Sequence, residues 1–483
     1  MSRASGYRGA VAVRRESPMS GLDRRNLGPL QVFAQSISGA APSAAMAAAP
    51  AVAAATAGGA VLWSFVAATV LALLIGVCVA QFTRRMAAAG SLYSLTAKGL
   101  GPVAAFAAGW ALLIGYGLLA MAALVGAGTY VHDVLRRMGL SPGWGAVAGT
   151  VVVLGVLATV LTVRGVRLSA KVVLVTEALS ISALLVVFGL LLARVAPELG
   201  FTPFTTEEGL GGVAGAVLPA LGAFVGFEAA ASFGVEARRP FQSVPRAVQW
   251  TAALCGVLYL VAAYTQAAGL SQLPGGLAGQ PEPMSTLAEL EGLPWLPYVL
   301  DAGIAASFFA CTMATSSALV RVLLSMGREG IVPRRLGTTH PRYRTPHVAI
   351  LLVLPAATLL PVVLLAAGVS TRELFVALLN IAVFGYLIAY LLVCAAAPVF
   401  LHRIGELTRG ALAASVIVAP VLLAVLVLFT VNNADGPYPL AFTLLLAAGL
   451  AWYAWVRARR PRQLAGIGIY DETSASDLLG GRP

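Results

Sequence analysis

One carboxylate stands out in this sequence because it lies inside an apolar run: Glu228, within Gly222–Ala247 (GAFVGFEAAASFGVEARRPFQSVPRA). A charge at the centre of a bilayer costs about 2.5–3.5 kcal/mol on insertion scales, so such residues are rare and mark functional sites. Gly222 and Gly226 loosen the backbone beside it, and Pro240 and Pro245 are expected to stop this same helix. A carboxylate in this position can carry a proton or face a cationic ligand. The alternative is a kinked helix in which Glu228 is protonated or paired with a neighbour.

A second interruption lies in the first apolar run, QVFAQSISGAAPSAAMAAAP, which contains Ser36, Ser38, Gly39, Pro42 and Ser43 near its middle. Proline cannot donate to the helix ladder and obstructs the preceding turn, so Gly39 and Pro42 are expected to set a break. Two broken helices leave backbone N–H and C=O groups free to face a ligand cavity. The alternative is a stripe of small residues that serves tight helix packing.

The composition requires a membrane around these elements. The chain has 483 residues, of which 59% are hydrophobic and 11% charged, with a mean hydropathy of +0.86. Soluble domains carry about 25% charged residues. The four cysteines occur singly and form no CxxC pair, so neither a disulfide framework nor a metal site is indicated. No GxxxxGK[ST], HExxH or GxSxG motif is present, so we expect no enzyme, no catalytic residues and no cofactor.

About twelve apolar runs are long enough to cross a bilayer, which takes about 20 residues. In chain order they are Pro29–Ala49, Gly59–Ala80, Pro102–Val131, Trp144–Val163, Val172–Ala193, Gly211–Val235, Trp250–Leu270, Leu296–Met326, Val348–Val369, Leu374–Phe400, Leu412–Val431 and Leu440–Val456. The two interrupted runs are the first and the sixth. They hold corresponding places in two halves of five spans, which is the pattern of an inverted repeat with a binding site at its interface.

The basic residues indicate the orientation. Of the 32 Lys and Arg residues, 28 lie in the tails and loops of one side, and only Arg136, Arg137, Arg194 and Arg372 lie on the other. By the positive-inside rule both termini are cytoplasmic, in the cell membrane, and the number of spans is even. The net charge of +12 is therefore a topology signal and not a nucleic-acid patch. The acidic segment Glu282–Glu291 is expected outside, as a short surface helix.

Three stretches resemble the amino acid–polyamine–organocation (APC) superfamily. GFEAAASFGVEARRPFQSVPRAV looks like its sixth span and exit loop, and AAAGSLYSLTAKGLGPVAAFAAGW, from Ala87 to Trp110, looks like its entry into span three. RVLLSMGREGIVPRRLGTTHPRYRTPHVAI, from Arg321 to Ile350, looks like its loop after span eight, with Arg328 and Glu329 where the family has Arg-Asp. This third stretch is long and ordered, so it is the most specific, and the resemblance covers nearly all twelve spans.

The resemblance implies an all-α integral membrane protein with the five-plus-five inverted-repeat (LeuT-like) fold and broken helices one and six. Its parts are a tail over 1–28, expected to be disordered, a first repeat over 29–200, a second repeat over 201–403, peripheral spans over 404–460 and a cytoplasmic tail over 461–483. The implied function is that of a permease, a secondary active transporter. It would move an amino acid or related small amine across the cytoplasmic membrane by alternating access, coupled to protons or by exchange.

The resemblance implies that the polar end of the substrate, such as a carboxylate, binds N–H groups in the break of span one. These groups lie at the N-terminus of a half-helix, whose partial positive charge favours anions. The ammonium of the substrate meets carbonyls freed around Phe224 to Ala229, and aromatic side chains cover it. Each aromatic has an alternative place in the core or facing lipid, and Asn380 is expected to be a buried amide that needs a partner. The substrate-binding candidates are Ser36, Ile37, Ser38, Gly39, Ala40, Ala41, Pro42, Ser43, Tyr116, Phe224, Gly226, Phe227, Glu228, Phe308, Asn380 and Tyr386.

The chain departs from the family at two places. Where the first span usually carries G-S-G it reads Ser43-Ala44-Ala45, which weakens the case for a carboxylate bound on a glycine nest. Some proton-coupled relatives carry a lysine in span five, at a place that falls near Ser180, but this span contains none. Glu177 lies one turn earlier. It is either a proton carrier or a surface acid paired with a loop arginine.

The coupling candidates are Glu177, Glu228, Thr315 and Ser316, with a proton or sodium as the ion. Hydroxyls in span eight, including that of Thr312, could help to coordinate sodium, although such groups more often bond back to a helix carbonyl. The alternative function is a polyamine or cationic-amine carrier with Glu228 as counter-ion. The alternative from a different class is a channel or a membrane-embedded binding protein. Uptake into proteoliposomes would distinguish it, because it would show no counterflow. The expected partners are a small-molecule substrate, the coupling ion and the lipid bilayer, and not nucleic acid.

The charge asymmetry predicts which segments an impermeant thiol reagent reaches in intact cells. We expect labelling of the Glu289→Cys variant and none of the Ser5→Cys variant, because the basic tail stays in the cytoplasm. Labelling at Ser5 but not at Glu289 would reverse the orientation.

Overall fold

The computed structural model describes residues 16–57, 60–141, 143–195, 209–280, 282–432 and 437–472. Within these ranges the regular elements are helices, joined by turns and by one isolated β-bridge between Leu27 and Ala237. The all-α fold predicted from the sequence is therefore confirmed. Ser5, which was chosen for labelling, lies outside the described residues.

Eleven candidate spans occur among the described residues. They are α1 with α2 (Pro29–Gly39, Pro42–Ala57), α3 (Val61–Thr83), α5 (Pro102–Arg137), α6 (Trp144–Val163), α7 (Val166–Val195), α9 (Pro240–Gly269), α11 (Leu296–Glu329), α12 (His347–Ala366), α13 (Thr371–Arg403), α14 (Arg409–Asn432) and α15 (Pro437–Arg459). The sixth predicted span is not one long helix, because it consists of the short helix α8 (Gly209–Gly222), a stretch of turns and the 3₁₀ helix η4 (Ala229–Phe233). The other short elements are α4 (Ser91–Leu100), η5 (Gly276–Gly279), α10 (Pro283–Leu290), η6 (Arg334–Gly337) and α16 (Pro461–Ala465).

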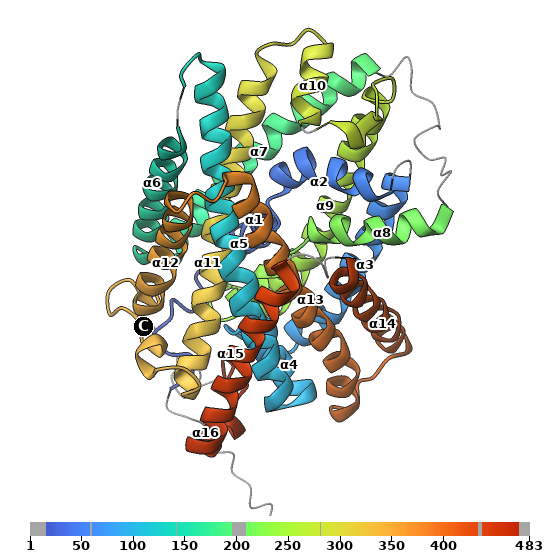
Figure 1. The fold of residues 1–483 in the computed structure, drawn as a ribbon. Coiled ribbons are helices and arrows are strands. Elements are labelled where there is room, and N and C mark those ends of the chain that lie inside the picture. The colour runs from blue at the N-terminus through green and yellow to red at the C-terminus, as the bar shows by residue number, and fades with distance from the viewer. Residues whose placement is uncertain are drawn as a thin grey trace, which may run out of the picture.

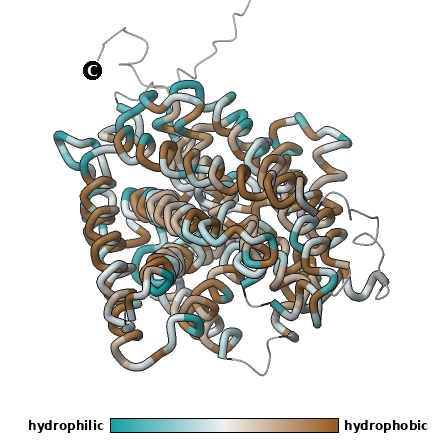
Figure 2. The backbone as a smooth tube through the Cα atoms, turned by 90° about the horizontal axis from the view of Figure 1, so that it is seen from above, coloured by the Kyte–Doolittle hydropathy of each residue, from teal (hydrophilic) through white to brown (hydrophobic). Residues whose placement is uncertain are grey.

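The helices form a bundle with two distinct ends. Figure 1 shows α10 at one end and α4 and α16 at the other. The peripheral helices carry hydrophobic residues over much of their length (Figure 2), and some of these are largely exposed, for example Leu179 at 67% and Leu450 at 69%. By contrast, 89% of the apolar window of α11 is buried, so this helix lies at the centre of the protein. Exposed apolar side chains on a bundle of this kind face lipid.

The N-terminal segment 16–28 does not match the expected disordered tail, because it packs against the α4 and α16 end. Met19 and Leu22 are buried. The N–H groups of Asn26 and Leu27 both donate to the carbonyl of Glu236, at 2.8 Å. The basic, Gly/Ser-containing composition predicted disorder because it does not reveal these partners, which lie some 200 residues away along the chain.

The sixth span ends before Pro240, as predicted, since η4 ends at Phe233; the two prolines belong to the next helix, because α9 begins at Pro240 and contains Pro245. Proline is tolerated in the first turn, where its missing N–H would have no intrahelical partner. Pro245 lies one turn further on, so it removes a single ladder bond. The seventh span therefore starts ten residues before the predicted Trp250.

An ion pair between Glu236 and Arg321 joins the exit of the sixth span to α11. Arg321 Nε lies 2.5 Å from Glu236 Oε2 and Nη2 lies 3.0 Å from Oε1, so the pair is bidentate. Both residues are buried, and the guanidinium also stacks over the Phe233 ring at 4.0 Å and donates to the carbonyl of Ser317. Such geometry satisfies most of the donors of a buried arginine.

Removing one partner of this pair should destabilise the fold. We expect Arg321→Met to lower the free energy of unfolding by about 3–5 kcal/mol, because Glu236 is left as an uncompensated buried charge. The matched control is Arg334→Met, at an exposed arginine, which should change stability by no more than about 0.5 kcal/mol. Unfolding of the purified variants in detergent measures both, and equal stability of the two would contradict this role of the pair.

Candidate functional site

The first break is two residues long. α1 ends at Gly39, Ala40 and Ala41 lie outside the helices, and α2 begins at Pro42. Ala41 has a φ of +44°, which is uncommon for a residue with a side chain. The break is therefore shorter than the interruption between Ser36 and Ser43 that the sequence suggests. Ser36, Ile37 and Ser38 belong to the last turns of α1, and Ser43 belongs to α2.

The second break lies in the sixth span. Residues 223–228 form turns between α8 and η4, and Gly226 has a φ of +91°. L-residues with side chains rarely adopt that conformation, so glycine is required there. The freed backbone groups find side-chain partners: the Tyr259 hydroxyl donates to the carbonyl of Ala223 at 2.9 Å, and the N–H of Gly226 donates to the Tyr390 hydroxyl at 3.1 Å.

The two breaks touch each other. A Cβ placed on Gly39 would collide with the carbonyl oxygen of Gly226, and a Cβ on Gly226 would collide with that of Gly39. The Ser36 hydroxyl donates to the carbonyl of Phe227, and the Cys311 thiol of α11 lies 3.5 Å from the carbonyl oxygen of Gly39. The backbones of spans one and six therefore meet beside α11.

Glu228 lies at this junction and is fully buried. Its Oε1 accepts a hydrogen bond of 2.7 Å from the Tyr116 hydroxyl of α5, and its Oε2 accepts one from the Tyr390 hydroxyl of α13. The Ser91 hydroxyl at the start of α4 lies 3.2 Å from that of Tyr116. Sequence reasoning singled out Tyr116 but missed Ser91 and Tyr390. Tyr390 is one helical turn from the candidate Tyr386, and that i, i+4 spacing is the signal that could have found it.

Glu228 therefore has neutral partners. Among the described residues no Lys, Arg or His forms an ion pair with it. The hydroxyl of Tyr386, whose ring lies 5.3 Å from that of Tyr116, is buried and has no hydrogen-bond partner in the same ranges. Buried polar groups are normally satisfied, so an unpartnered hydroxyl beside a buried carboxylate needs an explanation.

Glu177 is a second buried carboxylate, which rules out the alternative of a helix-surface acid. It lies in α7, and the Ser307 hydroxyl of α11 lies 3.0 Å and 3.3 Å from its two oxygens. The hydroxyl of Ser38 in α1 also approaches this carboxylate, although it makes no hydrogen bond of standard geometry within the described ranges. One turn along α7, the Ser180 hydroxyl lies 2.7 Å from that of Ser43 and 2.5 Å from the carbonyl of Gly303. Spans one, five and eight therefore meet through small polar groups.

The hydroxyls of α11 mostly bond to their own helix. Thr315 donates to the carbonyl of Cys311 at 2.7 Å and Thr312 to that of Phe308 at 3.0 Å, which is the back-bonding alternative to ion coordination. Ser316 is buried and has no partner among the described residues. In those same residues no three His, Cys, Asp or Glu side chains gather closely enough to hold a metal ion.

The aromatic candidates separate into two groups. Phe224 packs against Tyr259, with ring centroids 4.9 Å apart, and Phe227 packs against Tyr390 at 5.6 Å. Both are fully buried and belong to the core around the junction. Phe308 lies one turn before Cys311 on α11, toward α10. Asn380 of α13 is only half-buried, so the prediction of a buried amide is wrong.

A cavity of about 1080 Å³ lies between the junction and the α10 end, lined by residues of α2, α5, α10, α11 and α13. Phe308, Tyr130 and Phe375 form an aromatic cluster in its wall, with ring centroids 5.7–6.0 Å apart. Nearby, Arg137 of α5 binds Asp301 of α11 at 2.9 Å and Ser285 of α10 at 2.8 Å. The cavity thus approaches the junction from the α10 side, with Phe308 between the two.

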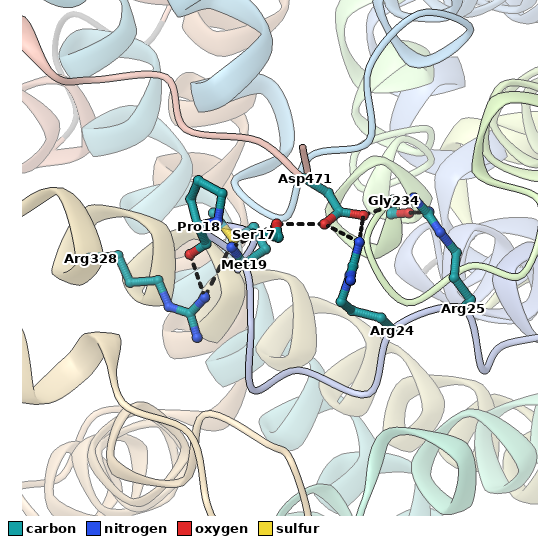
Figure 3. Close-up of polar contacts among 8 residues, drawn as sticks. All are labelled: Ser17, Pro18, Met19, Arg24, Arg25, Gly234, Arg328 and Asp471. Carbon is teal, nitrogen blue, oxygen red and sulfur yellow. Dashed lines mark hydrogen bonds and ion pairs between the residues drawn. The ribbon is translucent and has the colours of Figure 1, made fainter. Parts of the chain in front are cut away.

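The opposite end is covered by the two terminal segments. Figure 3 shows Asp471 between Ser17 and the guanidinium groups of Arg24 and Arg25, and Arg328 beside Pro18 and Met19. Asp471 accepts from Ser17 at 2.7 Å and pairs with Arg25 at 2.8 Å and with Arg24 at 3.0 Å. Arg328 Nη1 donates to the carbonyl of Pro18 at 2.7 Å.

Glu329, the neighbour of Arg328, holds the C-terminal segment. Its Oε1 accepts from the N–H groups of Gly468 and Ile469 at 2.7 Å and 2.8 Å. The Arg-Glu pair that carried the family resemblance therefore binds both terminal segments at the end of α11.

Comparisons with known proteins agree with this architecture. Residues 27–450 match the family described as amino acid permease. The chain is 28% identical over 413 residues to the branched-chain amino acid permease BcaP of Bacillus subtilis, covering 82% of this chain and 86% of that protein. It is 25% identical over 410 residues to the methylthioribose transporter of the same organism, with the same coverage of 82% and 86%.

Among solved structures, the chain resembles the manganese transporter of Eremococcus coleocola in complex with an aromatic bis-isothiourea substituted compound. The TM-score is 0.53 at 15% sequence identity, and the match covers 89% of this chain and 95% of the other. This likeness concerns the fold, and it confirms the LeuT-like arrangement predicted from the sequence.

A side chain at the contact between the breaks should disrupt the site. We expect Gly39→Val to abolish the function of the folded protein, because the added atoms displace the backbone of Gly226. Overpacking of this kind costs about 1–3 kcal/mol, so the variant should still insert and fold. The measurement is uptake into proteoliposomes, with gel filtration as the test of folding.

The matched control is Gly149→Val in α6, where no atom lies within 4 Å of the added Cβ. It should transport at the wild-type rate. Wild-type uptake by Gly39→Val would remove span one from the site.

Proposed function

Because the chain belongs to the amino acid permease family, we propose that it is a secondary active transporter that moves an amino acid or related small amine across the cytoplasmic membrane. The observation that carries the proposal is the contact between the two broken helices beside a buried carboxylate that has no cationic partner among the described residues. The family and its relatives are transporters and not enzymes. The two relatives named above carry different substrates, so the family alone does not select one.

The junction offers complementary groups for the two ends of an amino acid. α2 begins at Pro42, which has no N–H, and the N–H of Ala45 already bonds to the carbonyl of Ala41. The N–H groups of Ser43 and Ala44 have no intrahelical partner, and with the positive end of the helix dipole they lie at the break. The substrate carboxylate binds there. The substrate ammonium binds on the side of Glu228, where the hydroxyl of Tyr386 lacks a partner among the described residues. An ammonium that replaces one tyrosine as the partner of Glu228 gains a charge-assisted hydrogen bond.

Protons are the coupling ions in this proposal. Glu177 and Glu228 are buried carboxylates, and burial disfavours the charged form of an acid unless a partner compensates. Glu177 is held by Ser307 and approached by Ser38, so its protonation affects the contact of α1 with α11. A sodium site is less favoured, because Thr312 and Thr315 already donate to carbonyls of their own helix.

The asymmetry between the two ends supports alternating access as the mechanism. The cavity leads toward the junction from the α10 side, whereas the terminal segments cover the other end. In this proposal both termini are cytoplasmic and α10 is external, and the inverted repeats run over 29–200 and 201–403. Transport then requires closure around Phe308 and release of α1 from its contacts at the inner end.

A cationic-amine carrier is the second candidate. The observation that favours it is that Glu228 lacks an ion-pair partner in the described residues, so it could serve as the direct counter-ion of a substrate without a carboxylate.

Counterflow in proteoliposomes tests the transport class. Liposomes loaded with unlabelled branched-chain amino acid should accumulate the labelled compound transiently, which a channel cannot do. A panel that also contains putrescine and methylthioribose separates the substrate classes. Saturable uptake of none of these, with folded protein, would contradict the proposed function.

Glu228→Gln tests the role of the carboxylate, because glutamine keeps the shape and the hydrogen-bonding capacity but cannot ionise. We expect a folded protein whose uptake falls at least about tenfold or loses its pH dependence, since a hydrogen bond to a charged group contributes about 1.5–3 kcal/mol. Initial uptake rates across a pH series measure this.

The control is Glu289→Gln, at an exposed glutamate of α10, which should leave the pH profile unchanged. If Glu228 is only structural, Glu228→Gln transports normally and Glu228→Ala misfolds. If the uptake rate of Glu228→Gln depends on pH as that of the wild type does, Glu228 has no role in transport.

A further inference from the structure

A groove of about 540 Å³ runs along the outside of the bundle between α1 and α9. Its lining includes Leu30 and Phe33 of α1, Arg239 just before α9, and Arg246, Trp250 and Leu254 of α9. Leu30 is 68% exposed and Trp250 67% exposed, so the groove opens toward the surroundings of the protein and not toward the substrate junction. The cavity beside Phe308 shares no lining residue with it.

One end of the groove is positively charged. Arg239 and Arg246 are both exposed, and within the described residues neither guanidinium forms an ion pair or hydrogen bond. Gln242 and Ser243 lie between them in the lining and add neutral donors, and no lining residue is acidic. The nearest glutamate in the chain, Glu236, is buried and paired with Arg321. This end therefore suits an anion.

The other end is apolar and has the depth of one lipid leaflet. From Arg246 the lining continues along α9 through Ala253 and Leu254 to Val257. Eleven residues of α-helix rise about 16 Å, at about 1.5 Å per residue. Half of a hydrocarbon core of about 30 Å is nearly the same distance. Trp250, near the charged end, is a residue type enriched at membrane interfaces.

We propose that this groove binds an anionic phospholipid of the cytoplasmic leaflet. The phosphate lies between Arg239 and Arg246 with Gln242 and Ser243 as further donors, and one acyl chain follows the wall from Trp250 to Val257. Basic pockets between transmembrane helices on the cytoplasmic side are suited to such headgroups. A free phosphate would satisfy the arginines but would leave the apolar wall unoccupied.

The position of the groove connects the lipid to the transport helices. α1 ends at the Gly39 break, and just before α1 Leu27 pairs with Ala237, close to the start of α9. A lipid that contacts both α1 and α9 therefore holds α1 in the arrangement seen here. This site needs no assumption about the transported substrate.

Native mass spectrometry of the purified full chain tests the site, with phosphatidylglycerol and phosphatidylcholine as the probes. The wild type should retain phosphatidylglycerol in preference. The double variant Arg239→Gln with Arg246→Gln should bind phosphatidylglycerol about thirtyfold more weakly, from two contributions of about 1 kcal/mol each. Its binding of phosphatidylcholine should fall far less, because the choline ammonium offsets the phosphate charge of that lipid.

The matched control is Arg334→Gln with Arg335→Gln, two exposed arginines of η6 outside the groove. This control should bind phosphatidylglycerol as the wild type does. An equal loss in both double variants, or no loss in either, would overturn the proposal.

A second variant separates a lipid from a free anion. Val257 is 59% exposed, so Val257→Trp should fold, fill the apolar end and reduce phosphatidylglycerol retention with both arginines intact. Inorganic phosphate at equal concentration should neither displace the lipid nor raise the thermal midpoint of the wild type. Displacement by phosphate, or unchanged retention by Val257→Trp, would contradict a lipid site.

Discussion

The architecture depends on a backbone contact in which no side chain fits. Gly39 and Gly226 lie so close that a Cβ on either would collide with the carbonyl oxygen of the other. This approach brings the ends of two half-helices together and leaves polar backbone groups inside the protein. Such groups must be satisfied where no water is at hand. The partners of these backbone groups are the side chains of Ser36, Cys311, Tyr259 and Tyr390. Because three of these side chains come from neighbouring helices, the broken helices fix where α9, α11 and α13 lie.

The same junction explains why a carboxylate is tolerated in the sixth span. Glu228 is enclosed by protein and not by lipid, and its two oxygens bind hydroxyls from α5 and α13. Those hydroxyls stabilise the charge without cancelling it, so an ammonium or a proton still gains from binding there. Glu177 repeats this arrangement between α7 and α11, where Ser307 is the partner. In the proposed mechanism, these two buried acids on different helices couple substrate binding to proton binding.

Features that act locally were predictable from the sequence, and those that depend on distant partners were not. Gly39, Pro42 and Gly226 change the backbone wherever they occur, so the breaks could be located. Tyr390 donates a hydrogen bond to Glu228, which is 162 residues away in the sequence, and Arg25 binds Asp471, which is 446 residues away. No local sequence pattern reveals such pairs. The N-terminal segment was misjudged for this reason, because its arginines and buried Met19 gain their partners only in the fold. Asn380 was misjudged because a polar residue within an apolar run need not face the interior.

The central claim is that substrate binds where the two broken helices meet. The most direct measurement is a cryo-EM map of the protein in lipid nanodiscs, at a saturating concentration of an amino acid identified by counterflow. The account predicts density within hydrogen-bonding distance of the Gly39–Pro42 break and on the side of Glu228, with Phe308 closed over it. Ligand density confined to the cavity beyond Phe308, with the junction unchanged, would contradict it.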